Sequence, residues 1–215
     1  MLEEGITEEA EQMKNVKASE IKAGLLANLH YFFKWLLISV LIGSIGGVAG
    51  TIFSYGVAWA TDFRLSNRYM LFYLPAAGLL IIWMYRTFHE EGNRGTNMVI
   101  DAISSNEKVT AATGPLIFVS TILTHLTGGS AGREGAALQL GGSIGNSLGH
   151  VMRLDEKDEK IAIMCGMSAV FAALFGTPVA AGVFSLEVVS IGVLYYAALV
   201  PCIFSAYIGV GIARV

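Results

Sequence analysis

A glycine-rich polar run between apolar stretches is the feature that most constrains the fold of this chain. The run reads Gly-Gly-Ser-Ala-Gly-Arg-Glu-Gly at 128–135 and directly follows the apolar segment 113–127. At membrane depth, backbone freed by glycines must be covered by protein or face a water-filled cavity. These free amides, together with the start of the next helix, form a positive dipole end that suits an anion. The sequence therefore predicts an anion site inside the membrane.

The carboxylate of Glu134 lies at the mouth of this predicted site. It can compete with a diffusible anion for the same N–H donors, and its protonation would decide which of the two binds. We therefore predict proton-coupled anion movement with Glu134 as the gating and proton-transfer residue. The alternative is a glutamate that only caps a helix N-terminus, a role that does not require a location inside the membrane.

The composition is that of a multi-pass membrane protein. Of the 215 residues, 54% are hydrophobic and 14% are charged, against about 45–50% and about 25% in soluble domains. We predict a protein surrounded by lipid in the cell membrane. The net charge of −3 argues against a nucleic-acid partner.

No sequence pattern indicates an enzyme, a cofactor or a metal site. Cys165 and Cys202 lie in apolar surroundings without a C-x-x-C pattern, which predicts buried thiols. No nucleophile–base pair, metal cluster or nucleotide-binding loop stands out. The acidic, polar start at 1–26 is the wrong chemistry for a signal peptide. Lysines flank the first span and predict a cytoplasmic N-terminus: Lys14, Lys17, Lys22 and Lys34.

The apolar pattern predicts two parts, an amphipathic cytoplasmic helix at 1–26 and a transmembrane part at 27–215. The first span, 32–60, is longer than a bilayer requires, so it must tilt or bend at its glycines. A second span is expected at 69–88. After it, glycine-rich turns predict broken or re-entrant helices. The turns are expected at 92–97, 128–135, 141–149 and 176–178, and the helices at 97–106, 113–127, 133–151, 158–175, 178–189 and 191–213.

The segment 128–149 resembles the CLC family of anion channels and transporters at its G-R-E-G motif. The residues around that motif look like the fluoride-exporting branch: Gly128 to Gly135, then Ala136, Ala137, Leu138, Gln139 and Gly141. The resemblance runs from about residue 30 to the end of the chain. It implies an all-α membrane fold, the first of two inverted-topology repeats with broken or re-entrant helices. It further implies fluoride export by fluoride/proton antiport, with Glu134 as the gate.

A second motif, Glu-Gly-Asn-Arg-Gly-Thr-Asn-Met, lies at 91–98. Chloride-type members of the family have a turn there that resembles G-S-G-I-P, in which the serine hydroxyl contacts the anion. Counted back from Glu134 without a gap, Asn93 takes the serine position, and the fluoride branch carries Met or Asn there. The alternative is an asparagine that shapes a turn or caps a helix, and a slip of one residue would substitute Arg94 or Gly95. The predicted anion-binding residues are Gly92, Asn93, Arg94, Gly95, Gly132, Arg133, Gly135 and Ala136.

A third motif, Phe-Ser-Leu-Glu-Val-Val at 184–189, resembles F-x-x-E-E of the chloride/proton exchangers, but Val188 replaces the second glutamate. The resemblance therefore implies a proton route built around Glu134. Glu187 has the alternative role of a structural acid at a helix end. His125, just before the glutamate loop, could relay protons or could be a hydrogen-bonded packing residue.

Subunits of this family are about twice as long as this chain, and the features of their second half do not appear here. We expect the pathway to need a missing C-terminal half or a second copy of this chain, and completed subunits to form a homodimer. The 215 residues alone are expected to insert in a membrane without moving fluoride. Two other hypotheses stay open: a chloride channel or chloride/proton exchanger, and a non-transporting membrane fragment or assembly partner.

Overall fold

The computed structural model describes residues 2–93, 95–105, 109–189 and 195–214, with only the backbone for 2–28 and for residue 105. The chain divides into two compact units, Met1–Leu37 and Ile38–Val215. The described backbone of the first unit is helical throughout, as the start of helix α1 (Leu2–Ser66). The amphipathic pattern predicted within 1–26 concerns side chains outside the described residues.

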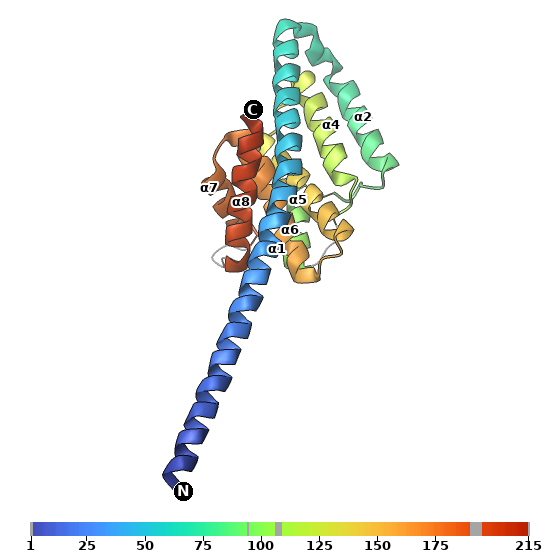
Figure 1. Cartoon of the computed structure of the whole chain (residues 1–215). Helices are drawn as coiled ribbons and strands as arrows, with labels where there is room; N and C mark the ends of the chain where they lie inside the picture. Colours follow the sequence, from blue (N-terminus) through green and yellow to red (C-terminus); the bar gives the residue numbers. More distant parts are fainter. Residues whose placement is uncertain (1, 94, 106–108, 190–194, 215) are drawn as a thin grey trace. The chain divides into compact units, whose positions relative to one another are not determined.

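The second unit is built from helices, and its described residues contain no strand. After α1 come, in order, η1 (Arg68–Tyr73), α2 (Leu74–Thr87), α3 (Thr96–Ser105), α4 (Thr113–Leu126), α5 (Arg133–Val151), α6 (Glu156–Phe175), α7 (Pro178–Glu187) and α8 (Tyr196–Ala213). Figure 1 shows α2 beside α4, and α6 packs against α5, α7 and α8. From α3 onward the predicted helices are confirmed to within a few residues, except that the expected boundaries 106 and 191 lie outside the described residues. The first span expected at 32–60 is instead part of the continuous helix α1, and the second span expected at 69–88 is divided into η1 and α2.

Three helical segments in the described chain are long and apolar enough to cross a membrane: Leu29–Ser66, Arg68–Thr87 and Tyr196–Ala213. By contrast, α3 and α7 have 10 residues each. At about 1.5 Å per residue they reach roughly half of a hydrocarbon core of about 30 Å. The predicted broken helices are therefore confirmed.

The glycines of the first span lie inside an unbroken helix and make room for neighbouring helices. A Cβ at Gly46 would lie 2.8 Å from the Cβ of Ala169 in α6. On the α8 side, a Cβ at Gly47 would lie 2.9 Å from the Cα of Gly209. These glycines thus act as close-approach positions between α1, α6 and α8.

The glycine-rich turn predicted at 141–149 is wrong, because α5 continues through it to Val151. Gly141, Gly145 and Gly149 instead line the contact with α6. A Cβ on Gly141 would collide with the backbone of Gly166, and one on Gly145 with the carbonyl group of Ala162. Glycines spaced four residues apart lie on one face of a helix, so this pattern marks a helix–helix contact rather than a break.

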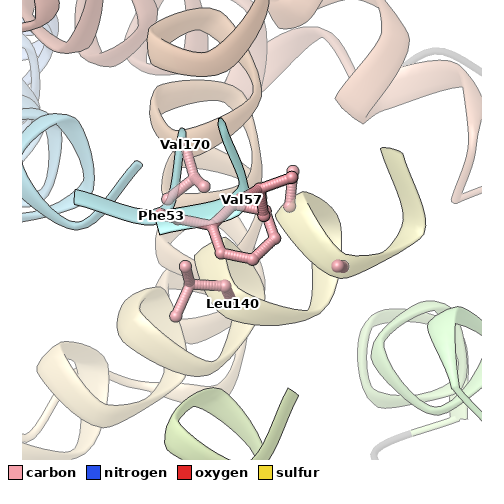
Figure 2. Packing of buried hydrophobic residues seen from close by; sticks show 6 residues of the cluster. Phe53, Val57, Leu140 and Val170 are labelled. Atoms are coloured by element: carbon pink, nitrogen blue, oxygen red, sulfur yellow. The ribbon is translucent and has the colours of Figure 1, made fainter. Parts of the chain in front are cut away.

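A neighbouring face of α5 takes part in the apolar core. Figure 2 shows Phe53 and Val57 from α1 packed with Leu140 of α5 and Val170 of α6. The ring of Phe53 also lies 5.7 Å from that of Phe118 in α4, centroid to centroid. Helix α5 is therefore held on several sides, which fixes the position of its first turn.

The turn between α6 and α7 agrees with its sequence. Gly176 has a positive φ of 71° and ends α6, and Pro178 occupies the first turn of α7. This follows the preference for glycine after a helix and proline at the start of the next. The two cysteines are buried free thiols, as predicted. Their sulfur atoms lie 3.9 Å apart between α6 and α8.

Candidate anion site

The loop before the candidate gate begins with a tight helix end. Gly128 has a φ of +88°, and the N–H of Gly129 donates to the carbonyl of Thr124 at 2.8 Å. This 6→1 bond with a left-handed residue before it is a Schellman motif, for which glycine is the favoured residue. A Cβ at Gly128 would lie 3.1 Å from both Arg64 and Leu71. The end of α4 is therefore positioned by the α1–η1 corner.

Glu134 lies in the first turn of α5, as the sequence predicts. The N-cap is Gly132, whose extended backbone carries no side chain to occupy the N–H groups that follow. A Cβ at Gly132 would lie 3.1 Å from Oε2 of Glu134, so the carboxylate folds back beside the N-cap. Gly132, Arg133 and Glu134 are exposed, whereas Ala136 is buried. A carboxylate placed there is stabilised by the helix dipole and competes with any anion for the same amides.

The second loop begins at another Schellman motif, at the end of α2. His89 has a φ of 55°, and the N–H of Glu90 donates to the carbonyl of Tyr85 at 2.8 Å. The motif usually brings an apolar residue to the position that Glu90 occupies. Here it buries a carboxylate, because only 6% of Glu90 is exposed.

Asn93 closes the turn that leads into α3. Its Oδ1 accepts a hydrogen bond from the N–H of Gly95 at 2.8 Å, and its Nδ2 donates to Oε2 of Glu90 at 3.4 Å. Gly95 has a φ of +67°, which explains the glycine there. The turn-forming contact of the alternative hypothesis is therefore present. It engages only the oxygen of the amide, while one of the two N–H bonds points to Glu90.

The two loops meet where α3 crosses α5. A Cβ at Gly135 would lie 2.8 Å from the hydroxyl oxygen of Thr96, and one at Gly95 would lie 3.9 Å from Nε2 of Gln139. Farther along, a Cβ at Gly142 would collide with Val99. Small residues on α5 thus let the start of α3 lie directly against the turn that carries Glu134.

Four of the predicted site residues differ in their surroundings. Gly95 faces Gln139 of α5, and Gly135 faces Thr96 of α3, so both lie where the two loops meet. Gly92 is exposed with open space around it, so neither crowding nor a positive φ explains that glycine. Arg94 lies outside the described residues.

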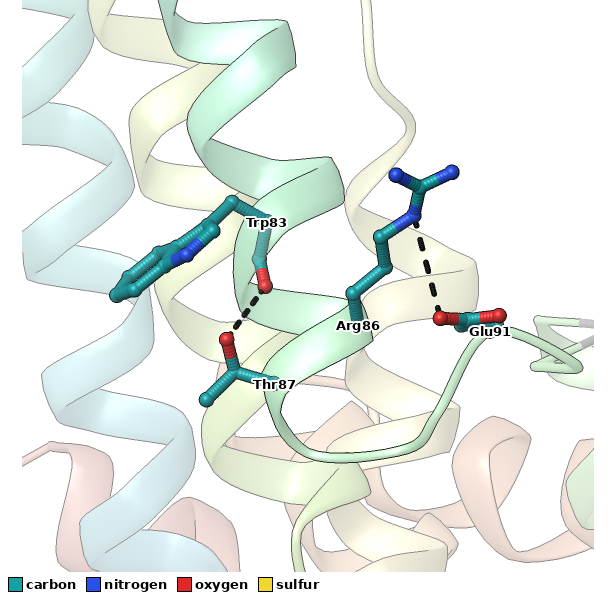
Figure 3. Close-up of polar contacts among 4 residues, drawn as sticks. All are labelled: Trp83, Arg86, Thr87 and Glu91. Atoms are coloured by element: carbon teal, nitrogen blue, oxygen red, sulfur yellow. Dashed lines mark hydrogen bonds and ion pairs between the residues drawn. The ribbon is translucent and has the colours of Figure 1, made fainter.

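Glu90 is a candidate that the sequence analysis did not select. A cavity of about 430 Å³ lies beside it, lined by Ile81, Ile82, Tyr85, Arg86, Glu90, Glu91 and Asn93. On this surface Arg86 and the exposed Glu91 form an ion pair of 3.9 Å, shown in Figure 3. Figure 3 also shows the Thr87 hydroxyl bonded to the Trp83 carbonyl, inside the last turn of α2. The cavity therefore combines both charge signs with the Asn93 turn.

Two weaker candidates have local structural partners. Nδ1 of His125 lies 2.9 Å from the carbonyl oxygen of Thr121, one turn earlier in α4. That contact fits the packing role. Glu187 is the last residue of α7, the helix-end position that its structural alternative predicts.

Comparison with known proteins identifies the family. A family model described as "Voltage gated chloride channel" matches residues 77–215, more than half of the chain. The chain belongs to this family. The CLC resemblance noted in the sequence is thereby confirmed.

The similar proteins include both fluoride and chloride members of the family. A curated relative from Pseudomonas syringae pv. tomato, named "Chloride/fluoride channel protein", is 36% identical over 84% of this chain and 40% of its own length. A crystal structure of a CLC-type fluoride/proton antiporter matches with a TM-score of 0.80 and 37% identity, over 85% of this chain and 47% of that one. A slow cyanobacterial Cl⁻/H⁺ antiporter matches in fold, with a TM-score of 0.63 and 22% identity over 84% and 46%. The chain thus spans less than half the length of each of these relatives.

Proposed function

We propose that this chain forms the N-terminal half of a proton-coupled anion transporter that exports fluoride in exchange for protons. The observation that carries the proposal is the meeting of the two glycine loops, because it sets the Asn93 turn against the first turns of α5, where Glu134 lies. The relatives' names support it, since they are named as channels or antiporters for chloride and fluoride. None of these names describes an enzyme.

The proposed gate works by competition at the N-terminus of α5. With its proton lost, the Glu134 carboxylate lies over the N-cap at Gly132 and binds the helix amides itself. A proton taken from one side of the membrane removes that charge, and an anion can then replace the carboxylate. Glu134 then releases the proton to the opposite side of the membrane, and the returning carboxylate expels the anion, so proton and anion movement become linked.

Several further parts belong to the same proposal. Residues 1–26 form a cytoplasmic surface helix and 27–215 the first transmembrane repeat, in the cell membrane, with lipid around it. A C-terminal half or a second copy of the chain completes the anion pathway, and completed subunits form a homodimer. The anion-binding loops are those that contain Asn93 and Gly132.

A flux assay tests the proposed function directly. The full-length natural protein is reconstituted in liposomes. An ion-selective electrode measures fluoride efflux while a pH-sensitive dye measures proton movement. Fluoride efflux with simultaneous proton uptake supports antiport. Chloride efflux that exceeds fluoride efflux would favour the chloride hypothesis, efflux without protons would favour a channel, and no flux would favour the non-transporting hypothesis.

We expect Asn93→Ser to reduce the preference for fluoride over chloride by a few-fold to about tenfold. The substitution removes an amide N–H from a turn beside the proposed site, and one weakened hydrogen bond is worth about 0.5–1.5 kcal/mol. The measurement is the ratio of fluoride to chloride flux in the same liposomes. Asn67→Ser, at an exposed asparagine after α1, is the matched control and should leave the ratio unchanged. A normal ratio in Asn93→Ser, with a shifted ratio in a Gly95 variant, would place the ion-contacting position elsewhere in the loop.

A further inference from the structure

The buried carboxylate of Glu90 requires an explanation beyond helix termination. Glutamate side chains are rarely buried without partners, because removing the charged group from water is costly. Its neighbour Glu91 has the ordinary arrangement, exposed and paired with Arg86. The left-handed conformation of His89 sends one acid inward and leaves the other at the surface.

Two donors from different elements meet on one oxygen of Glu90. Oε2 lies 3.5 Å from the hydroxyl oxygen of Thr113, at the start of α4, and 3.4 Å from Nδ2 of Asn93. Thr113 is fully buried. The carbonyl oxygen of Glu90 also accepts the backbone N–H of Asn93 at 3.1 Å. Glu90 thus contacts both the backbone and the side chain of Asn93, and Thr113 of α4 contacts the carboxylate of Glu90.

These contacts orient the Asn93 amide. Its oxygen is engaged by the N–H of Gly95, and one of its two N–H bonds points to Glu90. An amide contacted at both ends has a preferred plane, so its second N–H has a preferred direction. Both side chain contacts with Glu90 are longer than the usual 2.7–3.2 Å or so. The amide is therefore steered by Glu90 and keeps some freedom to respond to an ion.

We propose that Glu90 is a positioning residue that sets the fluoride preference of the site by orienting the amide of Asn93. The inference rests on the proposed function and deepens it. Glu90 acts through the amide and is not an anion ligand, because its own charge repels an anion. The cavity beside Glu90 and Asn93 gives an ion and its water room to approach the second N–H, for which the described residues offer no acceptor.

Four variants separate hydrogen-bond acceptance from charge. Glu90→Ala removes the acceptor, and Glu90→Asp keeps the charge but retracts it by one methylene. Both should lower the fluoride-to-chloride flux ratio by a few-fold to about tenfold, as in Asn93→Ser. Glu90→Gln keeps a carbonyl oxygen at the same reach and should retain the ratio. Glu156→Ala, at an exposed glutamate in the first turn of α6 that forms an ion pair with Lys160, is the matched control and should also retain it.

A double substitution tests whether Glu90 acts through Asn93. Glu90→Ala combined with Asn93→Ser should give no larger loss than either change alone, because both remove the same oriented N–H. Multiplied effects would overturn the inference, and so would a normal ratio in Glu90→Ala and Glu90→Asp. Normal proton-coupled flux in those variants would at the same time leave the proposed function intact. Gel filtration of each variant checks that it folds. If Glu90→Ala does not fold, Glu90→Asp replaces it in the flux comparison and in the double substitution.

A second readout needs no transport. In protein labelled with ¹⁵N-asparagine, the side chain NH₂ signals of Asn93 are assigned by their loss in Asn93→Ser. Glu90→Ala should shift both signals, and Glu156→Ala should shift neither. Unchanged Asn93 signals in Glu90→Ala would overturn the inference, whether or not the protein transports an anion. The absence of transport would be seen in the flux assay and would reject the proposed function separately.

Discussion

Glu134→Gln should abolish anion-driven proton movement in the reconstituted transporter. The residue lies in the first turn of α5, with its carboxylate beside the N-cap at Gly132. Glutamine has nearly the same size and can still accept hydrogen bonds from the helix amides, but it has no proton to take up or release. The measurement is proton uptake by liposomes under an outward fluoride gradient, compared with the unmodified protein. We expect the proton signal to fall to the level of empty liposomes.

The matched control for this prediction is Glu187→Gln. Glu187 is also an acid of a short apolar helix, but it lies at the end of α7 rather than at a helix N-terminus. It should retain proton coupling. If Glu134→Gln moved protons with fluoride as well as the unmodified protein does, the gate would have to be another residue.

The helices were predictable because their ends have local causes. Glycine at 128 and 176 supplies the left-handed residues that end α4 and α6, and Pro178 starts α7. The turn at 141–149 was wrong for a physical reason. The backbone of α6 lies so close to α5 that glycines are required there. A sequence pattern alone does not show which helix lies opposite.

The candidate site was predictable in part. Glu134 could be found because a charged residue in a glycine-rich, apolar context is unusual, and the structure places it at the start of α5. Glu90 could not be separated from Glu91, since both precede the same glycine. The left-handed backbone of His89, a conformation that is uncommon outside glycine, decides which acid is buried.

Gly166→Ala should prevent normal packing of α5 on α6. A Cβ at Gly166 would collide with the carbonyl oxygen of Gly141 and lie 2.9 Å from the backbone nitrogen of Gly145. Backbone atoms of a helix cannot rotate away as a side chain can, so the two helices must separate. Overpacking typically costs about 1–3 kcal/mol, and we expect this backbone clash to reach or exceed the upper end. Fluorescence-detected gel filtration after heating measures the loss of folded protein in detergent.

Gly211→Ala in α8 provides the matched control, because nothing lies within 4 Å of a Cβ there. Both substitutions gain the same helix propensity, about 1 kcal/mol in favour of alanine, so the difference between the two variants isolates the packing cost. Gly211→Ala should be as heat-resistant as the unmodified protein or slightly more so. Equal heat resistance in the two variants would mean that α6 can move away from α5 at little cost. In that case the first turn of α5, and the position of Glu134 with it, would not be held by the contact between these helices.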